Sequence, residues 1–127
     1  MQYFGSHPSV VEPVELIKNE NDEDVLVAYS LGNYISSFKY KNSDVEMIFN
    51  ITISKKTDDE KATLESADYV PVYVLDNGSK SDDRFELKDM KKLALEYDQE
   101  NDENITIKTY NEIIDKLTWL NQLMVRD

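Results

Sequence analysis

The stretch Val45-Glu-Met-Ile-Phe-Asn-Ile-Thr-Ile53 decides the fold class of this chain. Apolar residues stand at every second position, and polar residues fill most of the positions between them. Successive side chains of a strand point to opposite faces, so a period of two over this length predicts a strand with one face on a core. The core face would carry Val45, Met47, Phe49, Ile51 and Ile53, and the other face Glu46, Ile48, Asn50 and Thr52.

Two apolar segments precede this strand and predict a hairpin. Residues 25–31 are short and nearly all apolar, which is typical of a strand buried on both faces. Residues 10–17 contain Pro13, so they predict an edge strand or an irregular one. The polar run 19–24 lies between the two segments and has the composition of a hairpin loop.

Two further strands are predicted after the alternating stretch, at residues 61–66 and 69–75. Pro71 cannot donate a backbone hydrogen bond, which suggests an edge or a bulge in the second of them. The pair Asn77-Gly78 tolerates positive φ angles and predicts the turn that follows.

The apolar spacing changes to three and four residues near Asp89, which predicts helices over about 89–98 and 109–124. Asp89 is a suitable N-cap for the first helix, and Thr109 with Glu112 matches a capping box for the second. The fold class expected is therefore α+β, a mixed or antiparallel sheet over about 10–75 followed by C-terminal helices.

Composition excludes several function classes. The 127 residues carry a formal net charge of −12, with a sequence pI near 4.4, which argues against nucleic-acid binding and against electrostatic docking on an anionic membrane. There is no cysteine and one histidine, so a disulfide framework, a thiol nucleophile and any two-histidine metal site within this chain are excluded. No apolar stretch is long enough to span a bilayer.

The acidic runs 19–24 and 98–104 invite a calcium interpretation. An EF-hand loop needs a glycine at its sixth position, where these runs carry Asp24 and Glu103. Solvated loops are the better interpretation of both runs. The three glycines are also too few and too widely spaced for a phosphate-binding loop.

Two segments resemble a known family when they are taken together. The segment Gly5-Ser-His-Pro-Ser-Val-Val-Glu-Pro-Val-Glu15 resembles the G-[SH]-H-P-H-V-[VL]-Q-P-[IV]-E segment of bacterial capsule-synthesis proteins of the CapA family. The segment Tyr29-Ser-Leu-Gly-Asn-Tyr-Ile35 is similar to the second hallmark of that family, Y-S-L-G-N-[FY]-[VI]. Residues 68–74 resemble a weaker, extended Y-x-P feature. The resemblance covers roughly residues 3–75.

The CapA family comprises poly-γ-glutamate biosynthesis proteins whose domain looks like a calcineurin-type metallophosphoesterase. The resemblance implies that residues 1–127 are a single partial domain, the C-terminal portion of such a sandwich. The remaining metal-binding motifs of the family would lie upstream. The chain alone is then not expected to be catalytic, because metallophosphoesterases need two clustered metals.

Site residues are implied by the same resemblance. The H-x-H pair of the family falls on His7 and Ser9, so His7 is the metal-ligand position and a serine replaces the second imidazole. A hydroxyl is a poor ligand for the metals that imidazole binds. No cofactor is expected in this chain, and a divalent metal would belong to a full-length parent. Asn33 has two interpretations, either a substrate-binding residue at a cleft mouth or a turn residue that bonds local backbone beside a positive-φ Gly32.

The function expected is the C-terminal portion of a capsule biosynthesis protein at the cell envelope, extracytoplasmic and membrane-associated through its parent. Its partners would be the anionic capsule polymer or other capsule-synthesis proteins, and truncation would leave a face open for a homodimer. One alternative is a non-enzymatic interaction module of the cell envelope. A weaker alternative is an acidic calcium-binding domain.

Overall fold

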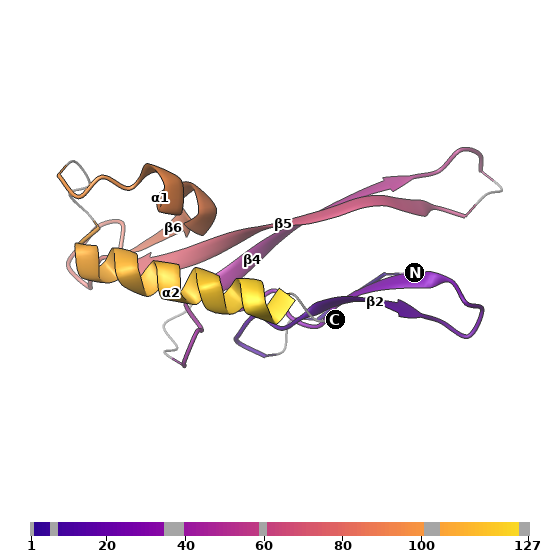
Figure 1. The fold of residues 1–127 in the computed structure, drawn as a ribbon, viewed down its shortest axis with the longest axis horizontal. Coiled ribbons are helices and arrows are strands. Elements are labelled where there is room, and N and C mark those ends of the chain that lie inside the picture. The colour runs from indigo at the N-terminus through magenta and orange to yellow at the C-terminus, as the bar shows by residue number, and fades with distance from the viewer. Residues whose placement is uncertain (1, 6–7, 35–39, 59–60, 101–104, 125–127) are drawn as a thin grey trace.

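A computed structural model describes residues 2–5, 8–34, 40–58, 61–100 and 105–124. The protein has an α+β fold in which two three-stranded sheets are followed by two C-terminal helices, as expected (Figure 1). In chain order the elements are β1 (Gln2–Phe4), β2 (Val14–Lys18), β3 (Asp24–Ala28), β4 (Val45–Ser54), β5 (Thr63–Asp76), β6 (Phe85–Asp89), α1 (Met90–Glu96) and α2 (Ile107–Met124).

The first sheet is mixed and has the order β1-β3-β2. β1 runs parallel to β3, and β2 pairs antiparallel with β3 across the predicted hairpin loop. The central strand β3 has a strand on each side, and its residues Val25–Ala28 are buried. This burial explains why the segment is almost continuously apolar. β2 starts only at Val14, directly after Pro13, so the strand is shorter than the predicted 10–17 segment.

The second sheet is antiparallel, with the order β4-β5-β6. β5 is one strand of 14 residues where the sequence predicted two, because its pairing with β4 runs from Thr63 to Tyr73 and so crosses the predicted break. The register irregularity in that pairing lies between Thr52 and Ile53 and not at Pro71. Pro71 lies just before the β5–β6 pairing begins at Val72, so its missing N–H removes no bond from that ladder.

The two helices cover one face of the second sheet and close the main core. Asp89 caps α1 as predicted, because its Oδ1 accepts a hydrogen bond of 3.0 Å from the backbone N–H of Lys92. The predicted cap of α2 at Thr109 is wrong. The helix begins at Ile107, and the hydroxyl of Thr106 accepts a bond of 3.2 Å from the Thr109 amide. The core comprises Val11, Val45, Met47, Tyr73, Leu75, Met90, Ile105, Ile113 and Leu120.

The first sheet lies beneath the long β4–β5 hairpin, on the side of the molecule away from α1 (Figure 1). The rings of Phe4 and Phe49 are in contact across the two sheets, with centroids 6.2 Å apart. At the hairpin tips, Lys61 forms an ion pair of 2.5 Å with Glu23. The backbone N–H of Met47 donates a 3.0 Å bond to the carbonyl of Leu31, so the segment after β3 runs beside β4.

Candidate functional site

The two segments that carry the family resemblance lie against each other. The backbone N–H of Glu12 donates a 3.0 Å bond to the carbonyl of Ser30, and Val11 and Leu31 form an isolated antiparallel bridge. The Ser30 side chain is fully buried, and its hydroxyl donates a 3.0 Å bond to the carbonyl of Pro8. These bonds join loop 8–13 to the segment after β3, although about twenty residues separate them along the chain.

Close approach explains why a glycine stands at position 5. Its N–H donates a 2.8 Å bond to the carbonyl of Ala28. A Cβ atom added at Gly5 would lie 2.1 Å from the carbonyl oxygen of Tyr29, a contact that real Cβ atoms essentially never make. Gly5 therefore allows the first motif to pass directly over the start of the second.

The sequence-predicted site residues are only partly placed. His7 lies outside the described residues, so the metal-ligand hypothesis for it remains a prediction. Ser9 lies half-buried in a bend just before Val11. Asn33 is half-buried at the end of the second motif. Gly32 beside it has a φ angle of +98°, which confirms the predicted positive-φ turn.

A buried carboxylate lies against this turn. Glu46 on β4 is 3% exposed, and a Cβ atom added at Gly32 would lie 2.0 Å from its Oε2 atom. The carboxylate thus occupies the space that any other residue at position 32 would fill. The alternation of residues 45–53 predicted that Glu46 lies on the face of β4 away from the core. The Gly32 turn covers Glu46 on that face and buries it.

Burial raises the pKa of Glu46 from 4.5 to about 7, and the negative charge of Asp44 adds to the rise. The backbone amides of Tyr34 and Asn33 act in the opposite direction and lower the pKa. Both amides act on the carboxylate as hydrogen-bond donors, although not at the strict geometry of an ordinary hydrogen bond. Within the described part of the chain, neither carboxylate oxygen has a partner at ordinary hydrogen-bond geometry. Glu46 is therefore an incompletely satisfied buried acid.

A cavity of about 280 Å³ has Glu46 in its wall, although the carboxylate oxygens of that residue are closed off from water. Its walls are mainly apolar and come from the second motif, β4 and β5. Besides Gly32 and Glu46, the residues around it are Leu31, Tyr34, Met47, Ile48, Phe49 and Val72.

A second hollow, of about 370 Å³, lies between the start of β4 and α2. Its acidic groups are already paired. Lys116 lies 2.5 Å from Asp44 Oδ1 and 3.5 Å from Glu112 Oε1, and its ammonium group lies 5.6 Å from the Tyr73 ring centroid. Burial, then the charges of Asp44 and Glu112, raises the pKa of Tyr73 above its ordinary value. This cluster fixes α2 to the sheet.

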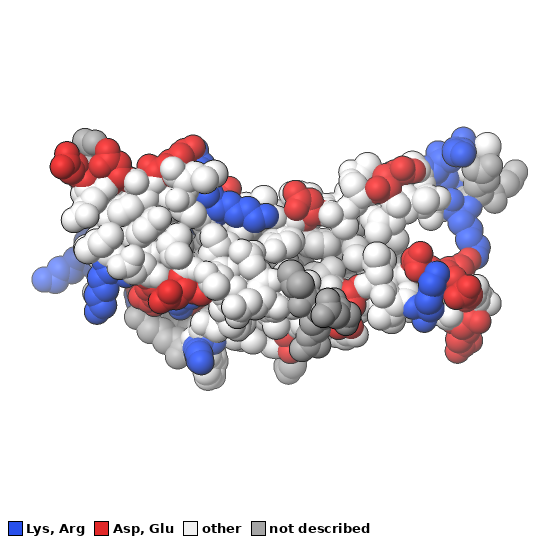
Figure 2. Space-filling model, viewed as in Figure 1, with Lys and Arg blue, Asp and Glu red and all other residues white. Residues whose placement is uncertain are grey.

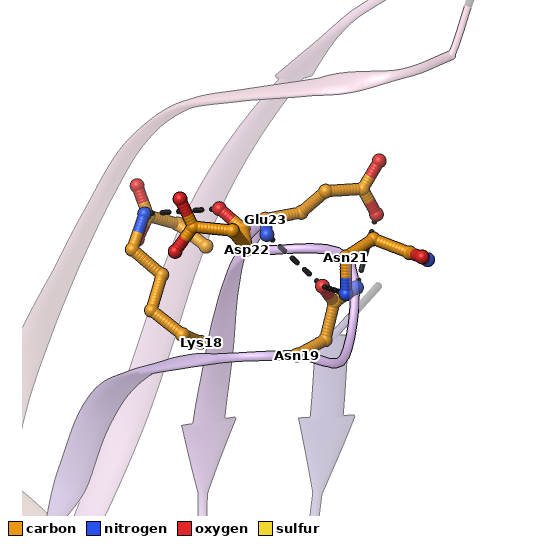
Figure 3. Close-up of polar contacts among 6 residues, drawn as sticks. Lys18, Asn19, Asn21, Asp22 and Glu23 are labelled. Atoms are coloured by element: carbon orange, nitrogen blue, oxygen red, sulfur yellow. Dashed lines mark hydrogen bonds and ion pairs between the residues drawn. The ribbon is translucent and has the colours of Figure 1, made fainter.

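The acidic hairpin loop between β2 and β3 is held together by its own polar groups (Figure 3). Asn19 Oδ1 accepts 2.9 Å bonds from the amides of Asn21 and Glu23. Lys18 pairs with Asp24 at 2.9 Å, and Lys61 lowers the pKa of the Glu23 carboxyl. The Glu23 carboxylate thus interacts with a lysine and a side-chain amide, and the Asp24 carboxylate with a lysine. Among the described residues no group of three or more potential metal ligands is gathered.

Charged side chains are distributed over the surface with clusters at both ends of the molecule (Figure 2). They do not form one continuous acidic face in this view. Neither helix in the described part of the chain has both the length and the apolar character of a membrane span.

No family model, no curated protein and no solved structure matches this chain.

Glu46 is the site residue that sequence reasoning did not single out. In the sequence it is one polar position of an alternating strand, like Asn50 or Thr52. Its burial depends on the Gly32 turn, a contact over fourteen positions that periodicity does not encode. The positive-φ glycine was the available signal, because such a turn allows a backbone to approach a side chain closely.

Proposed function

We propose that this chain is the C-terminal portion of a CapA-like capsule biosynthesis protein and acts in forming a poly-γ-glutamate capsule at the cell envelope. Its fold would then be part of a metallophosphoesterase-like sandwich. The metal ligands of the parent would be completed by upstream segments, and His7 would be the ligand that this chain contributes.

The observation that carries the proposal is the contact between the two motif segments. Two stretches that resemble hallmarks of one family pack together through Ser30–Pro8 and Glu12–Ser30 hydrogen bonds. The β2–β3 hairpin brings the two segments together, and these hydrogen bonds add a specific junction between the two motifs. Within the second matching segment, Gly32 also forms the positive-φ turn against Glu46 of β4.

Electrostatics favours other capsule-synthesis proteins over the free polymer as the direct partner. Poly-γ-glutamate is anionic, and this chain has a formal net charge of −12, so the two repel each other in the absence of a bridging cation. A divalent metal in the parent would supply that bridge. Direct polymer binding should therefore require the metal.

Deletion of the gene in its own organism tests the proposal. Poly-γ-glutamate released from the cell surface would be measured in the parent strain, in the deletion strain and in the deletion strain carrying the gene. We expect the deletion to lower surface polymer and the restored gene to recover it. Unchanged polymer in the deletion strain would overturn the proposal.

Two asparagine variants separate a role of Asn33 from a general effect of losing an amide. Asn33→Ala removes the candidate substrate-binding group, and Asn111→Ala removes an exposed amide on α2 as the matched control. We expect only Asn33→Ala to fail in restoring surface polymer while both proteins accumulate equally. Equal restoration by both would leave Asn33 with a turn role alone.

The metal hypothesis for His7 has a direct test in the full-length protein. Ser9→His restores the family pair, and bound metal is measured by elemental analysis after gel filtration. We expect more bound metal in this variant than in the natural sequence, because a second imidazole replaces a weak hydroxyl ligand. An unchanged metal content would assign the His7 region a structural role.

A non-enzymatic interaction module is the second candidate, and exposed apolar residues of the first sheet favour it. Tyr3 and Phe4 on β1 are 56% and 49% exposed, and Leu16 on β2 is 64% exposed. β1 and β2 are both edge strands, which are prone to pair with another chain. Light scattering at rising protein concentration should show a dimer. A monomer at every concentration would count against pairing through this sheet.

A further inference from the structure

The outer edge of β2 presents backbone groups that its own sheet does not use. The N–H of Tyr29 donates a 3.2 Å bond to the carbonyl of Pro13 at one end of the β2–β3 ladder. At the other end, the N–H of Asn19 donates a 3.0 Å bond to the carbonyl of Glu23. In an antiparallel pair such positions alternate with positions whose groups point away from the partner strand. Within the described part of the chain β2 has no strand on its other side, and three of its residues turn their N–H and C=O groups to that edge, namely Val14, Leu16 and Lys18.

A second open edge of the molecule, on β5, is protected. The part of β5 before its pairing with β6 has only β4 beside it, and the alternation turns Tyr69 and Pro71 outward there. Pro71 has no N–H to offer. The N–H of Tyr69 donates a 2.7 Å bond to Asp68 Oδ1, and its carbonyl accepts a 3.4 Å bond from Lys91. Proline and backbone groups that are already occupied prevent a sheet edge from pairing with another chain.

The β2 edge has the opposite character. Leu16 at its centre is 64% exposed and Ile17 beside it is 41% exposed. The strand contains no proline, and its two charges, on Glu15 and Lys18, cancel. Lys18 also forms an ion pair of 2.9 Å with Asp24. An exposed, apolar edge without net charge is the kind that pairs with a further strand.

The order of residues along β2 makes this edge complementary to itself. An antiparallel arrangement with Leu16 opposite Leu16 of a second copy also places Val14 opposite Lys18. All outward N–H and C=O groups of the strand then lie in hydrogen-bonded pairs. Glu15 lies opposite Ile17, so no charge of the strand faces a like charge. Strands paired in this way are related by a two-fold axis, which is the commonest symmetry of protein dimers.

We propose that two copies of this chain pair through β2 about a two-fold axis at Leu16, which joins their mixed three-stranded sheets into one continuous sheet. The inference rests on the interaction-module candidate described above and names a second copy as its partner. β1 is the less suitable edge of the same sheet, because it has three residues and its Phe4 ring is in contact with Phe49.

The dimer should become tighter as salt is added. Each copy has a formal net charge of −12, so the two copies repel each other, whereas the paired edge itself carries no net charge. Salt screens the repulsion and leaves the hydrogen bonds and apolar contacts of the edge in place. Analytical ultracentrifugation at low and high salt measures the change. An association that weakens with salt would indicate attraction between opposite charges, as with a cationic partner, and would overturn the proposal.

Two proline variants test the edge itself. Leu16→Pro removes an outward N–H of β2 and leaves the ladder with β3 intact, and Ala67→Pro makes the same change on the β5 edge. We expect Leu16→Pro alone to raise the dissociation constant of the dimer by at least about tenfold. A dimer that Leu16→Pro leaves unchanged would overturn the proposal but not the interaction module. A natural chain that stays monomeric at every concentration would overturn both.

Opposite charges at position 16 test the two-fold axis without a change to the backbone. Leu16→Lys and Leu16→Glu should each be monomeric, because like charges would face each other at the axis. An equimolar mixture of the two variants should dimerise, because the facing side chains then attract each other. Circular dichroism of each variant verifies that it is folded. A mixture that stays monomeric, or a single variant that dimerises like the natural chain, would overturn the proposed pairing.

Discussion

The Oε2 atom of Glu46 lies 2.0 Å from the position that a Cβ atom would occupy at Gly32. The backbone of Gly32 therefore covers a carboxylate, and its φ angle of +98° is the conformation that allows this. The contact joins the second motif to β4 and closes one side of the cavity. Both the stability of the turn and the acidity of Glu46 depend on it.

Gly32→Ala should destabilise the protein strongly. The substitution places a methyl group in a left-handed backbone conformation and forces the Glu46 carboxylate to move, at a cost of about 3 kcal/mol or more in the free energy of unfolding. Gly78→Ala is the matched control, because Gly78 has a φ angle of +89° with nothing within 4 Å of an added Cβ. It should cost about 1 kcal/mol. If urea unfolding showed the same loss of free energy for Gly32→Ala and Gly78→Ala, the contact with Glu46 would add nothing to the cost of a side chain at position 32.

The pH dependence of stability should carry the signature of Glu46. Its pKa is raised from 4.5 to about 7 in the folded protein, so between these values the folded state holds more protons than the unfolded one. The free energy of unfolding must then fall as the pH rises through this window, by up to about 3 kcal/mol for a shift of this size. Below the window the contribution of Glu46 to the pH dependence disappears.

Glu46→Gln isolates that contribution. The variant cannot ionise, so it should be more stable than the natural protein at about pH 8 and of similar stability at about pH 4.5. Urea unfolding at a series of pH values measures the difference between the two curves. If unfolding free energy changed with pH in the same way in both proteins, Glu46 would not be the group responsible for the pH dependence. Glu20→Gln, at an exposed position, should follow the natural protein throughout.

Local signals in the sequence predicted much of the fold, and long-range contacts account for what they missed. The alternation of residues 45–53 found β4, and the Asp89 cap found α1. β6 was not predicted, because Phe85–Asp89 has no clear period and gains its strand conformation by pairing with Val72–Asp76. Thr106 and Thr109 are equally good caps by type, and the choice between them depends on where Ile105 enters the core.

In the candidate site, too, local signals were predicted and long-range contacts were missed. The Gly32 turn was predicted, because a glycine that ends an apolar run has a local meaning. The burial of Glu46 was not, because it requires knowledge of which face of β4 the turn covers. The predicted hairpin of residues 10–17 and 25–31 already placed loop 8–13 near Ser30, but the hydrogen bonds between them have no local signal in the sequence.

Ser30→Ala should weaken the junction of the two motifs. The Ser30 hydroxyl donates to the Pro8 carbonyl at 3.0 Å and accepts a 3.2 Å bond from the Gly32 amide. Removing a fully buried hydroxyl leaves both groups unpaired, at a cost of about 1–3 kcal/mol. Ser66→Ala, at an exposed position of β5, should change stability by less than about 0.5 kcal/mol. Equal stabilities in urea unfolding would contradict the role of Ser30.

The ion pair between Lys116 and Asp44 should hold α2 on the sheet. The ammonium group lies 2.5 and 2.7 Å from the two carboxylate oxygens, and the Lys116 side chain is only 14% exposed. Lys116→Met keeps the apolar stem and leaves Asp44 half-buried without its cation, which should cost about 1–3 kcal/mol. Lys92→Met removes an exposed pair with Glu96 at 3.8 Å and should cost less than about 0.5 kcal/mol. Added salt should reduce the loss of unfolding free energy caused by Lys92→Met by a larger fraction than the loss caused by Lys116→Met, because exposed ion pairs are screened more strongly. A Lys116→Met variant as stable as the Lys92→Met variant would show that packing of α2 alone fixes the helix.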